Sequence, residues 1–289
     1  MSLRSRLSKP HYIFRPGQIV RRALLAKEAE PIVQTPWGCA MRVARADNLG
    51  AGIARIGVHE LAVSELVWRL AAGDDLAIDV GANIGYFTGL LARRAHQVIA
   101  LEPNPRLRRF IDDNVNGWDV RDAITLDYRA ASNASGLATL HLPSDYEQNF
   151  GVASLESSDA TASHEVQTVR LDDLIAGRQV GVLKIDVEGH ELAALQGASR
   201  SLSAGLIRDV IFEEHQPLPS PVSRLLESAG FAISGIEEAL TRPRLTAPNR
   251  TPHGWDAPTY LASRDLERAL RLASPRGWRC LHPRARRDG

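Results

Sequence analysis

The segment Leu76-Ala-Ile-Asp-Val-Gly-Ala-Asn-Ile-Gly-Tyr-Phe-Thr88 decides the fold. Its apolar first half predicts a buried strand, and the residues from Ile84 onward predict a helix. Gly81 and Gly85 lie in the turn between them, where the backbone can adopt dihedral angles that a Cβ atom would penalise and can approach a ligand closely. The segment therefore predicts a strand, a glycine-containing turn and a helix whose first amides point at a ligand.

The spacing of these glycines argues against a dinucleotide site. A dinucleotide fingerprint requires G-x-G-x-x-G, but Asn83 and Tyr86 occupy the second and third glycine positions. Asp79 stands before the first glycine, and a carboxylate there would repel a pyrophosphate but can pair with an ammonium group. An unpaired carboxylate in an apolar strand would be costly. S-adenosylmethionine has an ammonium group and no phosphate, so it is the predicted cofactor.

A second acid supports this cofactor. The apolar run 97–101 predicts the next strand, which ends in Glu102 and is followed by Pro103 and Asn104. A carboxylate at the tip of that strand can accept hydrogen bonds from two ribose hydroxyls, although NAD sites share this feature. The predicted cofactor-binding residues are Asp79, Gly81, Asn83, Gly85, Glu102 and Asn104.

The rest of the chain continues the alternation of strands and helices. Strands are expected near residues 123–131, 139–142, 182–186, 209–212, 231–236 and 258–262, and helices near 61–70, 86–94, 105–114 and 192–202, with another after 169–174. Thr35-Pro-Trp-Gly38 and Asn48-Leu-Gly50 are turn signals that predict small strands or a hairpin within 31–60. The alternation predicts an α/β, doubly wound, mostly parallel sheet with helices on both faces, a small N-terminal extension, and the last two strands as an antiparallel pair at the sheet edge.

The second chemical cluster is Lys184-Ile-Asp-Val-Glu-Gly-His-Glu191, which follows the apolar residues 181–183. Ligand crevices of open α/β sheets form at the carboxyl ends of strands, so Asp186 and Glu188 are predicted to belong to a site. Glu191 can instead simply open the following helix, where a carboxylate is favoured by the helix dipole.

Composition excludes several classes of protein. The 289 residues include 44% hydrophobic ones, enough for a full core, and the formal net charge of +1 gives no nucleic-acid footprint. Cys39 and Cys280 lie far apart without metal-ligand spacing, which favours reduced thiols in a cytoplasmic protein. No apolar run approaches the roughly 18 residues that span a bilayer. The expected organisation is a basic arm over 1–30, a cap over 31–70, a catalytic core over 71–263 and a basic tail over 264–289.

The first 27 residues contain seven Lys or Arg and no acid. Ile13-Phe-Arg-Pro16 interrupts the continuous apolar core that a secretory signal needs. A solvated arm is the favoured interpretation, and weak contact with an acidic membrane surface is the alternative.

Four motifs occur in the order and spacing of one family: Asp79-Val-Gly-Ala-Asn-Ile-Gly85, Glu102-Pro-Asn104, Leu171-Asp-Asp-Leu174 and the 184–191 run. The chain resembles the FkbM-type S-adenosylmethionine-dependent methyltransferases over about residues 50–263, and Ile211-Phe-Glu-Glu-His215 matches the late strand of that family. The resemblance implies a seven-stranded class I methyltransferase sheet. It also implies, in most members, methylation of a hydroxyl on a sugar or secondary metabolite.

Methyl transfer to an alcohol needs alignment and a base. The candidate catalytic residues are Asp186, Glu188, His190 and His215. A histidine with a pKa near 6.5 matches neutral pH better than a carboxylate with a pKa near 4, but the sequence leaves the base open between them. Mg²⁺ bound by Asp186, Glu188 and Glu213 or Glu214 is the less favoured interpretation, so no metal site is assigned.

The partner expected for this site is a small-molecule or glycan hydroxyl acceptor, with no nucleic acid. Alternatives are a lipid or peptide acceptor and a non-catalytic protein that binds S-adenosylmethionine. Residues 31–60, with Trp37, His59 and Glu60, are expected to cover the cofactor and shape the acceptor pocket.

Overall fold

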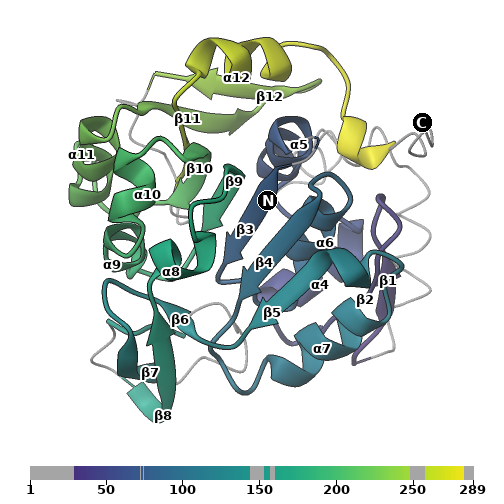
Figure 1. The fold of residues 1–289 in the computed structure, drawn as a ribbon. Coiled ribbons are helices and arrows are strands. Elements are labelled where there is room, and N and C mark those ends of the chain that lie inside the picture. Colours follow the sequence, from purple (N-terminus) through teal and green to yellow (C-terminus); the bar gives the residue numbers. More distant parts are fainter. Residues whose placement is uncertain are drawn as a thin grey trace.

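The computed structural model describes residues 29–71, 73, 75–143, 153–156, 160–247 and 258–282. Within them, eight strands form a central sheet (Figure 1) in the order β12 (Pro243–Thr246), β11 (Ala232–Glu238), β13 (Thr259–Ser263), β10 (Ile207–Glu213), β9 (Val180–Ile185), β3 (Leu76–Val80), β4 (Gln97–Leu101) and β5 (Ile124–Asp127). The five strands from β10 to β5 are mutually parallel, while β13 runs antiparallel to both β10 and β11. The doubly wound class I sheet and its antiparallel edge pair are confirmed. The sheet has one strand more than the seven expected, because β12 pairs with β11.

Helices cover both faces of this sheet, as expected. One face carries α5 (Leu61–Leu70), α6 (Tyr86–Ala92), α7 (Arg108–Asn116) and α12 (Leu266–Ala273), and the other carries α8 (Leu171–Ile175), α9 (Glu191–Gln196), α10 (Ser199–Ser203) and α11 (Pro221–Ser228). Successive strand residues point to opposite faces, so Val182 packs in the first core and Leu183 in the second. The single helix expected over 192–202 is divided into α9 and α10 at Gly197.

A second sheet lies beside the carboxyl ends of the central strands (Figure 1). Among the described residues it has three strands, in the order β6 (Ala130–Ala131), β8 (Ala160–Val169) and β7 (Gly136–Pro143). The strand expected at 123–131 is therefore two strands, β5 in the central sheet and β6 in the small one. Strand β8 was not predicted, because polar and small residues dominate it and weaken its alternation.

The N-terminal extension begins with the expected hairpin, β1 (Ile32–Gln34) and β2 (Ala40–Arg42). The expectation of a turn at 48–50 is wrong, because these residues open the helix α4 (Asn48–Ile56). The Asp47 carboxylate caps this helix by accepting a hydrogen bond of 2.8 Å from the Gly50 amide. A Cβ atom on Gly50 would lie 2.0 Å from the carbonyl oxygen of Ala44, so this glycine allows a close backbone contact.

Part of the expected C-terminal tail is folded. Beyond α12, the 3₁₀ turn η4 (Arg279–Leu281) packs against α5. Glu65 and Arg69 of α5 form a wholly buried ion pair, and the Glu65 carboxylate also accepts hydrogen bonds from the amides of Arg279 and Cys280. Arg69 donates to the carbonyls of Leu272, Ala273, Pro275 and Gly277. The division into arm, cap, core and tail stays a prediction.

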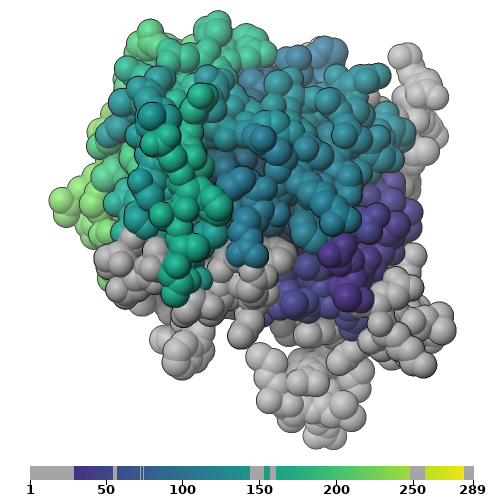
Figure 2. Space-filling model, turned by 90° about the horizontal axis from the view of Figure 1, so that it is seen from below, coloured from purple at the N-terminus to yellow at the C-terminus, as the bar shows by residue number. Residues whose placement is uncertain are grey.

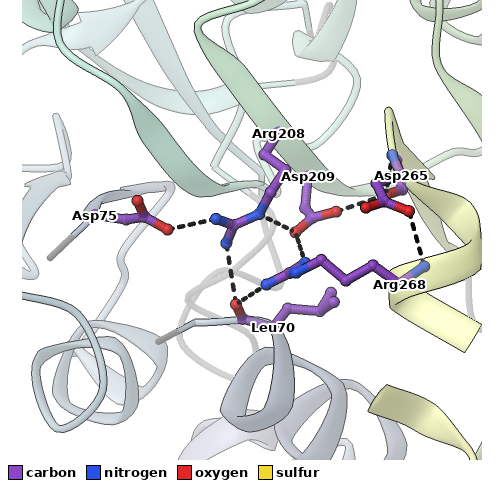
Figure 3. A network of polar contacts seen from close by, with 7 residues as sticks. Leu70, Asp75, Arg208, Asp209, Asp265 and Arg268 are labelled. Atoms are coloured by element: carbon purple, nitrogen blue, oxygen red, sulfur yellow. Dashed lines mark hydrogen bonds and ion pairs between the residues drawn. The ribbon is translucent and has the colours of Figure 1, made fainter. Parts of the chain in front are cut away.

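A network of charged side chains lies at the amino ends of the central strands (Figure 3). The motifs lie at the opposite ends of these strands. Asp209 of β10 is wholly buried and accepts hydrogen bonds of 3.0 Å from Arg208 and from Arg268 of α12. Arg208 also pairs with Asp75, which precedes β3. Both arginines donate to the Leu70 carbonyl at the end of α5. The amino ends of β3 and β10 are thereby fixed, and their carboxyl ends carry the motifs.

The junction between β3 and β9 brings the two main motifs together. The Asp186 amide donates a hydrogen bond of 3.0 Å to the Val80 carbonyl. Gly81 has φ +80°, and a Cβ atom there would lie 1.8 Å from the Asp186 carbonyl oxygen. Gly81 is therefore required by its backbone angle and by the adjacent chain, before any ligand is considered.

We expect Gly81→Ala to destabilise the protein more than Gly177→Ala. Gly177 has φ +79°, but a Cβ atom there would meet nothing within 4 Å. Gly177→Ala therefore measures only the cost of holding alanine in the left-handed conformation, about 1–2 kcal/mol. The clash at Gly81 should add about 1–3 kcal/mol. Urea unfolding of both variants measures the difference, and equal losses would contradict the close contact.

Candidate active site

A cavity of about 480 Å³ lies at the carboxyl ends of the central strands. Its wall combines the β3–α6 turn, the ends of β4, β9 and β10, the N-terminal segment, and the small sheet with its adjoining residues. Figure 2 looks onto this edge, with the small sheet on one side and the N-terminal residues (purple) on the other. One cavity therefore contacts both the turn of residues 81–85, called the glycine turn below, and residues 186–191 after β9, called the acid-rich loop below.

Glu102 organises the cofactor end of the cavity. Its carboxylate accepts hydrogen bonds from the amides of Asn83 at 2.8 Å and Asn104 at 2.9 Å. Burial raises the pKa of Glu102 to about 7, although both amides oppose this shift. Asn83 lines the cavity with φ +52°, whereas Asn104 is buried behind the lining. The structure thus brings together Glu102 and the turn, as their strand positions predicted.

Asp79 is wholly buried in β3, and its neighbours Val80 and Gly81, rather than Asp79 itself, line the cavity. One carboxylate oxygen accepts a hydrogen bond of 2.6 Å from Thr88, and the other has no hydrogen-bond partner among the described residues. Burial raises the pKa of Asp79, and nearby Lys184 counteracts the shift. Asp79 therefore holds α6 onto β3 and places a buried acid close to Lys184.

Gly85 begins α6 with φ +89°, where a Cβ atom would lie 3.2 Å from the Trp118 ring. Its position brings the first turn of α6 to the cavity, which Tyr86 and Phe87 line.

Lys184 is the charged partner of the acids. Its ammonium group donates a hydrogen bond of 2.9 Å to Asp186 and lies 4.7 Å from the centre of the Phe87 ring. Burial opposes this charge, but Asp186 and Asp79 outweigh burial and raise the pKa of Lys184. For Asp186, burial is outweighed by Lys184 and the hydrogen bond with Glu213 acting together, so its pKa is lowered. Lys184 and Asp186 are therefore both ionised at neutral pH.

Glu213, at the end of β10, shares a hydrogen bond with Asp186. Burial and the negative charge of Asp186 raise the pKa of Glu213 to about 10. Glu213 therefore carries a proton at neutral pH and can donate it to a hydrogen bond. From the sequence, Glu213 was considered only as a metal ligand.

Glu188 follows β9 in an unusual backbone conformation, with φ +50°. Burial, together with repulsion from Asp186 and Glu191, raises its pKa to about 7. His215 lies beyond β10, and its Nε2 atom is 3.9 Å from a Glu188 carboxylate oxygen. The His215 side chain is 47% exposed, so this pair connects the cavity with solvent.

His190 also lines the cavity, but both ring nitrogens have partners. Nδ1 lies 2.6 Å from a Glu156 carboxylate oxygen, and Nε2 lies 3.1 Å from the Ser132 hydroxyl. Neither nitrogen is free to accept a proton from a ligand in this arrangement.

The N-terminal segment contributes His59 and Glu60 to the lining, whereas Trp37 is buried and packs edge-on against Tyr86. The Tyr86 hydroxyl accepts a hydrogen bond of 2.8 Å from the His59 amide and donates to the His59 carbonyl at 3.0 Å. Glu60 has φ +41°. Asn48 and Leu49, which also line the cavity, belong to the segment 31–60 that was expected to cover the cofactor. The lining residues Leu140, Ala153 and Leu155 were not predicted, because no local pattern marks a residue that reaches a site through tertiary contacts.

No group of three or more His, Cys, Asp or Glu side chains in the described ranges is arranged to hold a metal ion. Within the same ranges, no helix is long and apolar enough to cross a membrane.

Comparisons with known proteins agree with the motifs. Residues 79–233 match the Methyltransferase FkbM domain. The chain is 30% identical over 171 residues to "Hexuronic acid methyltransferase AglP" of Haloferax volcanii, covering 58% of this chain and 67% of that protein. It is 29% identical over 203 residues to "Methyltransferase 1" of Beauveria bassiana, covering 61% and 78%.

Among solved structures, a methyltransferase FkbM from Methylobacillus flagellatus aligns with a TM-score of 0.42 and 17% identity, over 75% of this chain and 61% of that one. The match to the family domain spans more than half of the chain and includes the glycine turn, Glu102 and the acid-rich loop. The chain belongs to the FkbM methyltransferase family.

Proposed function

We propose that the protein transfers a methyl group from S-adenosylmethionine to a hydroxyl oxygen of a sugar or a related hydroxylated small molecule. The observation that carries this proposal is the single cavity lined by the glycine turn, Glu102, Asp186 and Glu188. Membership of a methyltransferase family supports the reaction class. The relative whose name specifies a hexuronic acid supports a sugar acceptor.

The cofactor end is assigned to residues of the turn and the β4 tip. Glu102, fixed by the amides of Asn83 and Asn104, is suited to accept hydrogen bonds from ribose hydroxyls. Gly81 and Gly85 keep Cβ atoms out of the turn, and the Asp79 carboxyl, one oxygen of which has no hydrogen-bond partner among the described residues, is suited to a cationic ligand nearby. When bound, S-adenosylmethionine supplies an electrophilic methyl group on a positively charged sulfur.

The acceptor end is assigned to the residues after β9 and β10. Glu188 is the proposed base, because its pKa of about 7 leaves a large ionised fraction at neutral pH. Transfer forms an O–C bond and breaks the S–C bond, with the electron pair of that bond passing to sulfur. The hydroxyl proton passes to Glu188 and leaves to solvent past His215. Asp186 and protonated Glu213 are suited to orient acceptor hydroxyls, and His190 to fix the loop.

The charge of the lining favours an acceptor without a carboxylate. Among the described lining residues there is one lysine and no arginine, and that lysine is paired with Asp186. Glu60 and Glu188 face the same cavity. A uronic acid would bring a further negative charge against these groups, whereas a neutral or amino sugar would not.

A transfer assay with labelled S-adenosylmethionine tests this function. Hydroxylated small molecules and glycans are separated by ion exchange into anionic, neutral and cationic pools before the assay. We expect label in the neutral or cationic pool. Label in the anionic pool alone would contradict the charge argument, and label only in lipid or peptide would contradict the sugar acceptor. Binding of S-adenosylmethionine without transfer to any acceptor would favour a non-catalytic protein.

Glu102→Ala should weaken binding of S-adenosylmethionine by about ten- to a hundredfold, because hydrogen bonds to a charged group contribute roughly 1.5–3 kcal/mol. Isothermal titration calorimetry measures this loss, with Glu227→Ala on the outer surface of α11 as the matched control. Transfer should partly recover at saturating cofactor. An unchanged affinity would refute the assignment of Glu102.

Glu188→Gln should lower kcat by about 10²–10⁴-fold, the usual contribution of a positioned base, and leave cofactor affinity within a few-fold. In the unaltered protein the rate should rise with pH around 7, because Glu188 accepts a proton only when ionised. The variant should lose this rise. Glu165→Gln on β8 is the control, and a retained pH profile in Glu188→Gln would assign the base elsewhere.

A further inference from the structure

Residues 153–156 lie between β7 and β8 in the chain and contact the acid-rich loop. A backbone bridge fixes them to the small sheet, since the His141 amide donates to the Ser154 carbonyl at 2.8 Å and the Ser154 amide returns a bond of 3.1 Å. Ala153 and Leu155, on either side of Ser154, line the cavity. This short segment thus belongs to both the small sheet and the cavity wall.

Ser154 is buried and connects this segment with Glu188. Its hydroxyl donates a hydrogen bond of 2.7 Å to the Glu188 carbonyl and accepts one of 3.1 Å from the Glu156 amide. The Glu188 carbonyl belongs to a residue with φ +50°, a conformation that a non-glycine residue keeps only when its surroundings impose it. The Ser154 hydroxyl is one of the groups that impose it.

Glu156 makes a second connection, two residues further along. Its carboxylate lies 2.6 Å from Nδ1 of His190, and Nε2 of His190 lies 3.1 Å from the hydroxyl of Ser132, directly after β6. With Nδ1–H donating a hydrogen bond to the Glu156 carboxylate, Nε2 accepts a hydrogen bond from the Ser132 hydroxyl. The His190 ring is therefore fixed at both ends by groups that adjoin the small sheet.

The acid-rich loop also has internal bonds, from the amides of Val187 and Gly189 to the Glu191 carboxylate at 3.0 and 3.3 Å. These bonds fix the amides on either side of Glu188. The Glu188 carbonyl, in contrast, depends on Ser154. The internal bonds and the external ones thus restrain different atoms of the same loop.

We propose that Ser154 and Glu156 are positioning residues for the transfer reaction, which fix the Glu188 backbone and the His190 ring so that the Glu188 carboxylate faces the acceptor. The proposal rests on the proposed function of Glu188. It makes the small sheet a part of the catalytic apparatus, although Ser154 and Glu156 need not contact the cofactor or the reacting atoms.

Ser154→Ala tests the proposal, with Thr168→Val as the matched control. Thr168 lies in β8 of the same sheet and also donates its hydroxyl to a carbonyl, that of Ala134 at 2.8 Å. We expect Ser154→Ala to lower kcat about five- to tenfold, the effect of one lost hydrogen bond, with cofactor affinity within about twofold. Ser154→Thr, which keeps the hydroxyl, should restore most of the rate, and Thr168→Val should change it less than about twofold.

A double-mutant cycle separates positioning from general stability. If Ser154 acts through Glu188, the effect of Ser154→Ala should fall below about twofold in the Glu188→Gln background. An undiminished effect in that background, or equal losses in Ser154→Ala and Thr168→Val, would overturn the proposal.

A readout that needs no acceptor is the carboxyl titration of Glu188, followed by ¹³C NMR. The titratable groups around this carboxylate are Asp186, Glu191, Lys184, Glu213 and His215. Ser154→Ala should shift the midpoint by more than the control does, because the carboxylate changes its distance to these charges. An unshifted midpoint would overturn the proposal, whether or not methyl transfer is detected. A failure to detect transfer to any acceptor would instead refute the proposed function.

Discussion

The contact between Gly81 and the carbonyl of Asp186 is the constraint on which the site depends. It allows the turn after β3 to lie directly against the chain leaving β9, with the Asp186 amide bonded to Val80. Because parallel strands end at the same edge of a sheet, this contact joins two motifs that are a hundred residues apart in the chain. A side chain at position 81 would separate the turn from the acid-rich loop, and the single cavity would be lost.

The site also depends on a balance between the buried acids and Lys184. Burial and repulsion from Asp186 raise the pKa of Asp79 and Lys184 opposes this shift, while Lys184 is itself kept ionised by the two acids. With this cation committed to Asp186, Glu213 keeps a proton and Glu188 titrates near neutrality. Three carboxyl groups in one cavity thus acquire three different protonation states, which is the usual basis for dividing orienting and proton-accepting roles.

Local patterns predicted the parts of the fold that depend on local sequence. The strand–turn–helix at 76–88, the Glu102 strand tip and the 184–191 loop each carry their own signal, so their elements and their common sheet edge were foreseeable. Strands β8 and β12 were missed because polar residues or a proline obscure their pattern, and their pairing partners stabilise them. The pairing of His190 with Glu156 and Ser132 joins residues 34 and 58 positions apart, which no spacing rule reveals. The same limit concealed the hydrogen bond between Asp186 and Glu213.

The left-handed backbone of Glu188 has a consequence for how this protein can change. Glycine or asparagine would adopt φ +50° at lower cost than glutamate, so the residue that best suits the backbone is not the one that carries the carboxylate. If Glu188 is the base proposed above, selection for stability alone would favour an inactive chain at this position, and retention of glutamate would reflect selection for chemistry. Glu60, which lines the same cavity and lies outside the matched family domain, has a similar backbone angle of φ +41°. At both positions a charged side chain reaches the cavity from a backbone conformation that glycine or asparagine would adopt more easily.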